Sequence, residues 1–266
     1  MIFVLAGTLE GRNTAGLLQQ NGFKVAASAV TPYGARLLEM QGINYVYTGP
    51  LNGPALQGFL QRGCRLLVDA THPFATLASE TAMEAAGESG VPYLRLERPA
   101  TQLPVHPLVH AAGSLEDCIN KALSLGKVLF STLGSKNLPS LLTPVRAAGA
   151  KVVARVLPDS QVISRCCEWG LSPAEIIALR GPCSKELNKV LYREYGAQVI
   201  LTKDSGDTGG VAEKITAAVE LGLPVVVWQR PKLNYPRMVD SPDKVLEFCL
   251  TNLGKHTKED YPCGKG

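Results

Sequence analysis

The chain alternates between short apolar runs and longer stretches with helical periodicity, and this alternation constrains the fold more than any other feature. Short β-rich runs separated by helices are typical of parallel strands joined by right-handed crossovers. In the first part of the chain the expected strands are 2–6, 25–29, 45–47, 66–69 and 91–96, and the expected helices are 11–20, 34–40, 55–61 and 75–88. The sequence therefore predicts an α/β fold with parallel sheets.

The second part of the chain repeats this organisation after a proline-rich stretch, residues 97–107. Such a stretch is typical of a linker. We expect one domain over 1–98, a second over 99–252, and a poorly ordered polar tail over 253–266. In the second domain the expected strands are 127–131, 151–155, 176–179, 199–201 and 225–228, and the expected helices are 137–148, 185–195, 211–221 and 242–250.

Composition excludes several classes of protein. A net charge of +4, from 27 basic and 23 acidic residues without a dense basic run, does not indicate a nucleic-acid partner but suits a small anionic ligand. No apolar stretch is long enough to span a membrane, and the N-terminus lacks the basic flank of a signal peptide. The 7 cysteines form no C-x-x-C pair, so neither a zinc site nor a disulfide framework is expected. A reducing cytoplasm fits, and the oligomeric state stays open.

Residues 66–75, LLVDATHPFA, concentrate polar groups at the end of a buried strand. Asp69 ends the strand, and Pro73 suits the first position of the following helix. Asp69, Thr71 and His72 are thus expected at a carboxyl end of the sheet, where open α/β sheets bind ligands. The alternative for His72 is a hydrogen-bonded helix cap. It is not expected to bind zinc, since it has no partner ligands at a suitable spacing.

The turns after the first two strands favour a nucleotide. Small residues in 7–12, GTLEGR, let the backbone approach a phosphate at a helix N-terminus. The full G-x-G-x-x-G pattern is absent, so a tight turn without a ligand is an equal alternative. After the second strand no acid is placed to bind a ribose 2′-hydroxyl. Ser28, Thr31 and Arg36 suit a 2′-phosphate instead, which favours NADPH over NADH, unless Arg36 is an ordinary solvated residue.

Three turns in the second domain also carry polar groups. Residues 131–137 place hydroxyls and Lys136 at a helix start, and Ser184 in 180–184 is best explained as a helix cap. The turn 202–210, TKDSGDTGG, is richer in glycine than a structural turn requires, and it precedes a helix that carries Lys214. A loop of this kind is able to wrap an anionic ligand.

Taken in order, these motifs resemble the precorrin-6A reductase family of cobalamin biosynthesis, including its cobalt-precorrin-6A counterpart. The sequence departs from the family pattern at Leu133, where a second threonine is expected, and at Cys183, where an aromatic residue is usual. The matching stretches are 7–12, 69–75, 95–99, 132–138, 154–158, 180–182, 202–206 and 230–231.

The resemblance implies an oxidoreductase that uses a nicotinamide coenzyme to reduce one double bond of a polycarboxylated tetrapyrrole, converting precorrin-6A to precorrin-6B, with or without cobalt. It implies two Rossmann-like domains, the first for the coenzyme and the second for the tetrapyrrole. It also implies an exchange of the last strands, with 91–96 entering the second sheet and 225–228 the first. No metal site is expected in the protein.

The expected site residues follow from this resemblance and from the chemistry of carboxylates, which arginine and lysine bind by charge-assisted hydrogen bonds. We expect loops of both domains to line one cleft, with Lys203, His72 or water as proton donor. The alternative for each of these lysines and arginines is that it is an ordinary charged residue on the surface, with no role in binding. Expected coenzyme-binding residues are Gly7, Thr8, Glu10, Gly11, Arg12, Ser28, Thr31, Arg36, Thr71 and His72, and expected substrate-binding residues are Arg95, Arg98, Lys136, Lys203, Ser205, Gly206, Lys214 and Arg230.

Two other functions remain compatible with the sequence. One is a reductase of a different anionic substrate on the same scaffold, which activity screening would distinguish. The other is a non-catalytic module that binds a nucleotide or an anion, which would bind NADPH without transferring hydride to any acceptor.

Overall fold

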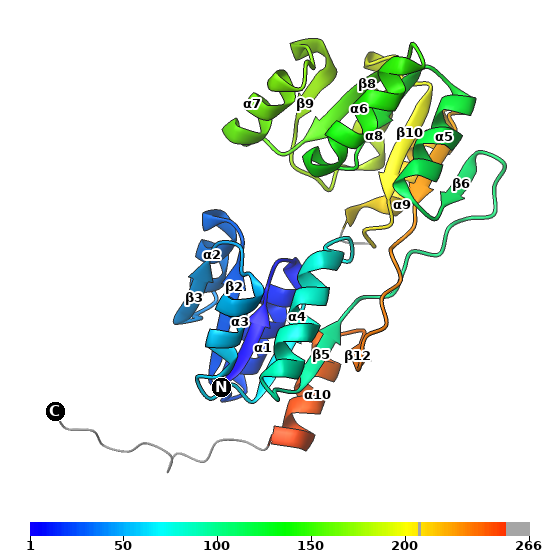
Figure 1. The fold of residues 1–266 in the computed structure, drawn as a ribbon. Coiled ribbons are helices and arrows are strands. Elements are labelled where there is room, and N and C mark those ends of the chain that lie inside the picture. The colour runs from blue at the N-terminus through cyan, green and yellow to red at the C-terminus, as the bar shows by residue number, and fades with distance from the viewer. Residues whose placement is uncertain (207–208, 254–266) are drawn as a thin grey trace, which may run out of the picture. The chain divides into compact units, whose positions relative to one another are not determined.

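A computed structural model describes residues 1–206 and 209–253 of the chain. The chain divides into two compact units, each with its own sheet (Figure 1). The first unit comprises Met1–Pro99 and the segment that begins at Lys232, and the second comprises Ala100–Pro231. Each unit is described by itself below.

The first unit holds a six-stranded parallel sheet in the order β12-β5-β4-β1-β2-β3. Helices alternate with the strands along the chain and cover both faces of the sheet (Figure 1). The elements are β1 (Ile2–Leu5), α1 (Leu9–Gln20), β2 (Val25–Ala29), α2 (Pro32–Glu39), β3 (Tyr45–Thr48), α3 (Gly53–Leu60), β4 (Leu66–Asp69), α4 (Thr76–Glu88), β5 (Tyr93–Leu96), β12 (Met238–Val239) and α10 (Pro242–Leu253).

Strand residues of the first sheet are apolar on both faces, because helices cover both of them. Along β1, Ile2 and Val4 belong to one buried cluster, which also contains Val245 and Cys249 of α10. Phe3 and Leu5 belong to the cluster on the opposite face. This alternation explains why the strands read as continuous apolar runs in the sequence.

The second unit has the same architecture, with a parallel sheet in the order β6-β11-β10-β7-β8-β9. Its core also lies on both faces of the sheet, with Leu201 in one cluster and Ile200 in the other. The elements are β6 (Val109–Ala112), α5 (Leu115–Leu125), β7 (Val128–Ser131), η1 (Ser135–Asn137), α6 (Leu138–Ala147), β8 (Lys151–Val156), α7 (Ser160–Glu168), η2 (Pro173–Glu175), β9 (Ile176–Ala178), α8 (Lys185–Glu194), β10 (Val199–Lys203), α9 (Val211–Glu220) and β11 (Val225–Trp228).

Both sheets show the strand order of a Rossmann fold, 3-2-1-4-5-6, so the expected fold class is confirmed. The sixth strand of each sheet comes from outside the consecutive series. In the second sheet it is β6, which precedes β7 in the chain, and in the first sheet it is β12, which follows β11.

The expected strand exchange was therefore assigned to the wrong strands. The fifth strand of each series stays in its own sheet: β5 pairs with β4, and β11 pairs with β10. A crossover helix precedes each of these strands and returns it beside its predecessor. Past β5 and β11 the chain instead carries Pro99, Pro104, Pro231 and Pro236, and the described residues that follow directly form no helix. The segments beyond the prolines then supply the exchanged strands β6 and β12.

The division into units differs from the expected domains at the C-terminal end. Residues 232–253 lie in the first unit rather than the second, because Val245 and Cys249 of α10 are buried in its core. Leu253, expected in the polar tail, is the last residue of α10. The rest of the tail, 254–266, lies outside the described residues.

The sequence analysis missed the strands β6 and β12, the α-helices α5 and α7, and the short 3-10 helix η2. Both α-helices carry clear start signals. Ser114 accepts a hydrogen bond from the Asp117 amide (3.0 Å) at the start of α5, and Asp159 caps α7 in the same way. The missed strands have 4 and 2 residues, and most of these are not fully buried, so neither forms the continuous apolar run that marks the predicted strands. Pro73 lies in the turn before α4, where the Ala75 amide donates to the His72 carbonyl (2.7 Å), and not in the first helical position.

Candidate functional site

The carboxyl ends of β1 and β4 meet at the point where the order of the first sheet reverses. This is where open α/β sheets bind ligands. The Thr8 hydroxyl joins the two loops, because its Oγ1 donates to the carbonyl of Ala70 (2.9 Å) and accepts from the Gly11 amide (3.0 Å). The same side chain therefore caps α1 and fixes the loop after β1 against the loop after β4.

Gly11 lets α1 pack directly against these loops. A Cβ atom at Gly11 would lie 2.9 Å from both the Ala6 Cα and the Ala70 Cβ, so no side chain fits. Gly7 is exposed, and a Cβ atom there would have only the Thr71 Cα as neighbour, at 3.9 Å. Close packing at Gly11 and an open backbone at Gly7 are the features that a dinucleotide pyrophosphate requires at a helix N-terminus. This part of the site fits a dinucleotide coenzyme.

Asp69, at the end of β4, is the centre of a buried polar network. Its carboxylate accepts from the Thr71 amide (2.9 Å) and the Tyr93 hydroxyl (2.6 Å), and it pairs with the Arg95 guanidinium (2.9 Å). Burial alone would raise the pKa of Asp69, but the charge of Arg95 and the hydrogen bonds hold it below its usual value. Burial and the neighbouring carboxylate raise the pKa of Tyr93, so its hydroxyl stays a donor.

Arg95 is fully buried, and this position does not support the expected contact with substrate. Besides Asp69, its guanidinium contacts Glu97 (2.9 Å), donates to Thr71 Oγ1 (3.0 Å) and lies over the Tyr235 ring (5.1 Å from the centroid). Arg95 thus orients the Thr71 hydroxyl, which accepts this hydrogen bond. Sequence reasoning missed Tyr235, which comes from the segment that leads into β12.

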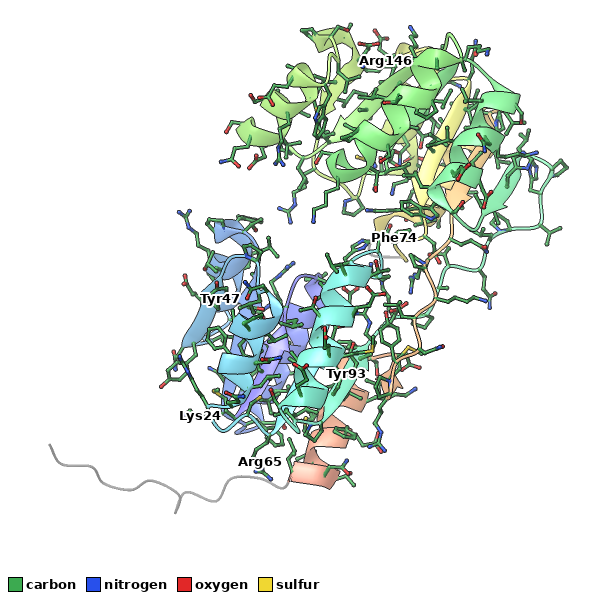
Figure 2. The ribbon with its side chains drawn as sticks, in the orientation of Figure 1. Lys24, Tyr47, Arg65, Phe74, Tyr93 and Arg146 are labelled. Atoms are coloured by element: carbon green, nitrogen blue, oxygen red, sulfur yellow. The ribbon has the colours of Figure 1, made fainter. Side chains whose placement is uncertain are left out.

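Arg98 and His72 also make local contacts in the first unit. Arg98 NH1 pairs with Glu10 Oε1 (2.6 Å), which joins an expected substrate residue to an expected coenzyme residue in the first turn of α1. His72 Nδ1 accepts from the Phe74 amide (3.2 Å), and the two rings lie 5.8 Å apart at the carboxyl edge, opposite the edge that bears Lys24 and Arg65 (Figure 2). This contact fixes Nε2 as the protonated nitrogen in neutral His72.

The residues expected to bind a ribose phosphate differ in accessibility. Ser28 is buried in β2, and Thr31 uses its hydroxyl to cap α2 by accepting from the Gly34 amide (3.1 Å). Arg36 is exposed on α2, and Arg12 is half-buried on α1. Arg36 lies in the last turn of α2, and Thr31 caps the opposite end of this helix.

The second sheet repeats this arrangement at the ends of β7 and β10. Both the amide and the hydroxyl of Thr132 donate to the Leu201 carbonyl, at 2.8 and 3.0 Å, which joins the two strand ends. Burial, and secondly the charge of the exposed Lys136, lower the pKa of Lys203 to about 8. Ser205 and Gly206 are buried in the following loop.

Arg230 and Asp204 form a second nearly buried ion pair, with 3.3 Å between Arg230 Nε and Asp204 Oδ2. Arg230 also donates to the Asp204 carbonyl (3.0 Å), and Asp204 Oδ1 accepts from the Thr101 amide (3.1 Å). These contacts fix the loop after β10, so the charge of Arg230, expected to bind substrate, is balanced within the protein.

Lys214 and Arg155 are cations buried on one face of the second sheet. Lys214, in the first turn of α9, donates to the Gly209 carbonyl (2.7 Å), and Arg155 of β8 donates to Asn188 Oδ1 (2.9 Å). Burial, followed by the charges of Arg155 and Lys203, lowers the pKa of Lys214 to about 8. Sequence reasoning did not select Arg155, although an arginine inside an otherwise apolar strand is a recognisable signal.

Other kinds of site find no support in the part of the chain that the structure describes. Its His, Cys, Asp and Glu residues form no group of three that could hold a metal ion. The six cysteines among residues 1–206 and 209–253 are all free, and Cys263 lies outside these ranges. None of the helices in these ranges has the length and apolar character needed to cross a membrane.

Comparison with known proteins agrees with this architecture. The profile of the family "Precorrin-6x reductase CbiJ/CobK" matches residues 1–250. The chain is 37% identical to the cobalt-precorrin-6A reductase of Methanothermobacter thermautotrophicus, over 96% of this chain and 86% of the relative. It is 35% identical to the cobalt-precorrin-6A reductase of Priestia megaterium, over 92% of this chain and 96% of the relative.

Among solved structures, the CobK precorrin-6A reductase has the same fold. It superposes with a TM-score of 0.74 at 23% sequence identity, and the match covers 96% of this chain and 97% of that structure. The family match over nearly the whole chain, together with the two Rossmann-like units, shows that this protein belongs to the precorrin-6x reductase CbiJ/CobK family.

Proposed function

We propose that this protein reduces one double bond of the macrocycle of cobalt-precorrin-6A, in cobalamin biosynthesis, with NADPH as the reductant. The observation that carries the proposal is the family match over residues 1–250. Membership of this family makes the protein a nicotinamide-dependent reductase. The two relatives compared above, at 37% and 35% identity, both have the cobalt form of the substrate in their names, which supports cobalt-precorrin-6A over the metal-free compound.

The first unit is the proposed site of the coenzyme. The exposed backbone of Gly7 and the N-terminus of α1, held in place by Thr8, suit a pyrophosphate. No carboxylate follows β2 at the position that would bind a ribose 2′-hydroxyl, and Arg36 is exposed on α2, the helix that follows this strand. A guanidinium there favours the 2′-phosphate of NADPH over NADH. Glu10, Arg12 and Ser28 remain expected neighbours of the coenzyme.

The second unit is the proposed site of the tetrapyrrole. A macrocycle that carries acetate and propionate groups requires several cationic donors. Lys136, Lys203 and Lys214 supply positive charge after β7, after β10 and on α9, and Ser205 and Gly206 belong to the same loop as Lys203. Arg95, Arg98 and Arg230 pair with carboxylates of the protein and serve to fix the loops around the ligands.

In the reaction the bound coenzyme supplies a hydride to one ring carbon, and a proton is added to the neighbouring carbon. The chain's own task is to place the ligands and to balance their charge. Arg95 orients the hydroxyl of Thr71, and Asp69 fixes the Thr71 amide beside the coenzyme loop. Since its pKa is about 8, Lys203 is mostly protonated at neutral pH and can donate a proton; His72 Nε2 and water are the other candidate donors.

The test incubates the pure protein with cobalt-precorrin-6A or metal-free precorrin-6A, each with NADPH or NADH. The absorbance of the reduced coenzyme is followed, and the product is identified by its mass. Faster oxidation of NADPH with the cobalt substrate, and a product heavier by two hydrogens, is expected. If NADPH binds but no tetrapyrrole is reduced, the protein is a binding module. If only another anionic acceptor is reduced, it is a reductase of a different substrate.

A further inference from the structure

Arg155 is a buried guanidinium without a carboxylate partner. Its side chain lies in the apolar strand β8 and is 8% exposed. With the described residues this side chain makes one hydrogen bond, from NH1 to Asn188 Oδ1 (2.9 Å), and no ion pair. The described residues give its other guanidinium nitrogens no hydrogen-bond partner, and neither of these nitrogens is fully enclosed. Their N–H groups can donate to a further ligand.

Asn188 holds this guanidinium in place. The Asn188 side chain is fully buried, and its Nδ2 donates to the carbonyls of Cys183 (3.1 Å) and Ser184 (2.9 Å). These two bonds leave Oδ1 directed at Arg155. A glycine lies over the guanidinium, since a Cβ atom at Gly181 would be 3.8 Å from Arg155 NH2. The arginine is thus pre-oriented beneath the turn that connects β9 to α8.

Lys214 places a second buried cation near the same turn. It is 5% exposed, and its Nζ donates to the Gly209 carbonyl (2.7 Å), which is its only side-chain hydrogen bond with the described residues. The chain around it is tightly packed against the turn, since a Cβ atom at Gly210 would lie 2.9 Å from Pro182 Cβ. The charged and titratable groups that act on Lys214 are Arg155, Lys203, Cys183 and Glu213, and Glu213 is exposed on α9.

Burial of two like charges without a carboxylate is costly, because both lose their hydration and repel each other. Among the described residues no carboxylate forms an ion pair with Arg155 or Lys214, whose side-chain hydrogen bonds go to amide and carbonyl oxygens, and Glu213, the carboxylate that acts on Lys214, is exposed to solvent. An arrangement of this kind is stabilised when a ligand brings the missing charge. A planar guanidinium that is held in one orientation matches the two oxygens of a carboxylate.

We propose that Arg155 and Lys214 form a buried subsite for one carboxylate side chain of the tetrapyrrole, beneath the turn Gly181–Cys183. The proposal rests on the proposed function, which it deepens by assigning a specific subsite. A phosphate of the coenzyme has related chemistry. We assign the carboxylate because the first unit already offers the glycine loop and the helix N-terminus that suit the coenzyme phosphates.

The main test replaces each cation by methionine, in Lys214→Met and Arg155→Met, with Lys151→Met as the control. Lys151 is exposed at the opposite end of the strand that carries Arg155. Loss of one charge-assisted contact is expected to raise the KM for the tetrapyrrole about 10- to 100-fold, with kcat and the KM for NADPH nearly unchanged. The control is expected to match the wild type.

Thermal unfolding distinguishes binding from a structural role. Removal of an uncompensated buried charge is expected to leave the melting temperature of Lys214→Met unchanged or higher, although the bond to Gly209 is lost. A lower melting temperature with an unchanged KM would show that Lys214 serves only the fold, and would overturn the proposal. For Arg155, Arg155→Lys is the second variant, because it keeps a positive charge and a donor for Asn188. Its KM for the tetrapyrrole is expected to lie between those of the wild type and Arg155→Met.

Binding without turnover separates this proposal from the proposed function. The probe is uroporphyrin, a stable polycarboxylated tetrapyrrole, titrated against wild type and variants while its fluorescence is followed. Weaker binding to Lys214→Met and Arg155→Met than to Lys151→Met supports the subsite, even if no hydride transfer is found. If these variants lose affinity for NADPH and keep it for uroporphyrin, the site holds a phosphate and the proposal is wrong.

Discussion

Arg95 and Asp69 form an ion pair in which both side chains are completely buried, with 2.9 Å between Arg95 NH1 and Asp69 Oδ1. The pair lies at the carboxyl ends of β4 and β5, and each partner also contacts Thr71. The loop that the proposed function places beside the coenzyme is therefore fixed by charge and not only by packing. Several consequences of this arrangement and its neighbours are measurable.

Replacement of Arg95 by methionine is expected to lower the free energy of unfolding by about 3–5 kcal/mol, because the Asp69 carboxylate stays buried without its counter-charge. Urea unfolding measures the effect. The double variant Arg95→Met with Asp69→Leu is expected to recover part of the loss, since it removes both buried charges. A single variant as stable as the wild type would contradict the assignment of this pair.

Gly11→Ala is expected to destabilise the protein by about 1–3 kcal/mol, because the added Cβ would lie 2.9 Å from both the Ala6 Cα and the Ala70 Cβ. The affinity for NADPH is expected to fall with it, since α1 must move away from the loop after β4. Gly58→Ala is the matched control, with nothing within 4 Å of its added Cβ in α3. That change is expected to stabilise the protein by about 0.5–1 kcal/mol. Equal effects of the two substitutions would refute the packing argument.

Thr8→Val keeps the shape of the side chain but removes the hydroxyl that caps α1 and contacts Ala70. The expected cost in stability is about 0.5–2 kcal/mol. Ser114→Ala removes the equivalent cap of α5 in the second unit and is expected to cost a similar amount. Only Thr8→Val is expected to raise the KM for NADPH. A comparable rise for Ser114→Ala would mean that the effect on the coenzyme is a general consequence of lower stability.

The contribution of Lys214 to the stability of the ligand-free protein is expected to rise with pH above about 8, where Lys214 loses its proton in the folded state. The unfolded chain keeps this proton up to the usual pKa of 10.5, so between these values the unfolded state binds more protons. Free energies of unfolding are measured from pH 7 to about 10 for the wild type and for Lys214→Met. At pH 7 the variant is expected to have the higher free energy of unfolding, and this difference is expected to shrink as the pH rises. If the free energies of the two proteins change in parallel with pH, Lys214 is not a buried charged lysine.

Local sequence signals were sufficient for most of the fold. Apolar runs and helix periodicity gave nearly all strands and helices of the two sheets, because residues buried on both faces of a parallel strand leave a continuous apolar pattern. The bounds of β2 and β4 agree with the expected ranges. The exchanged strands β6 and β12 were not predictable in this way, since both are short edge strands whose pairing depends on distant parts of the chain.

The sequence also predicted one part of the candidate site and not another. The glycines, hydroxyls and cations at the strand ends are visible in the sequence, because a ligand that binds there requires small or polar residues at each turn. The partners of the cations are not visible, since a charge is neutralised by whichever side chain the fold brings near. Arg95 and Arg98 carry the same charge as Lys214, yet only the arginines find carboxylates among the described residues.

By itself, then, the sequence determined the α/β class, the order of the strand-end motifs and the family, because each depends on neighbours along the chain. Only the tertiary structure decided that β12 and α10 complete the first unit, that Arg95 is buried in an ion pair with Asp69, and that Arg155 lies buried without an ion pair among the described residues. These facts depend on contacts between residues far apart in the chain, and the free energy of such contacts is set by packing and burial that no local pattern records.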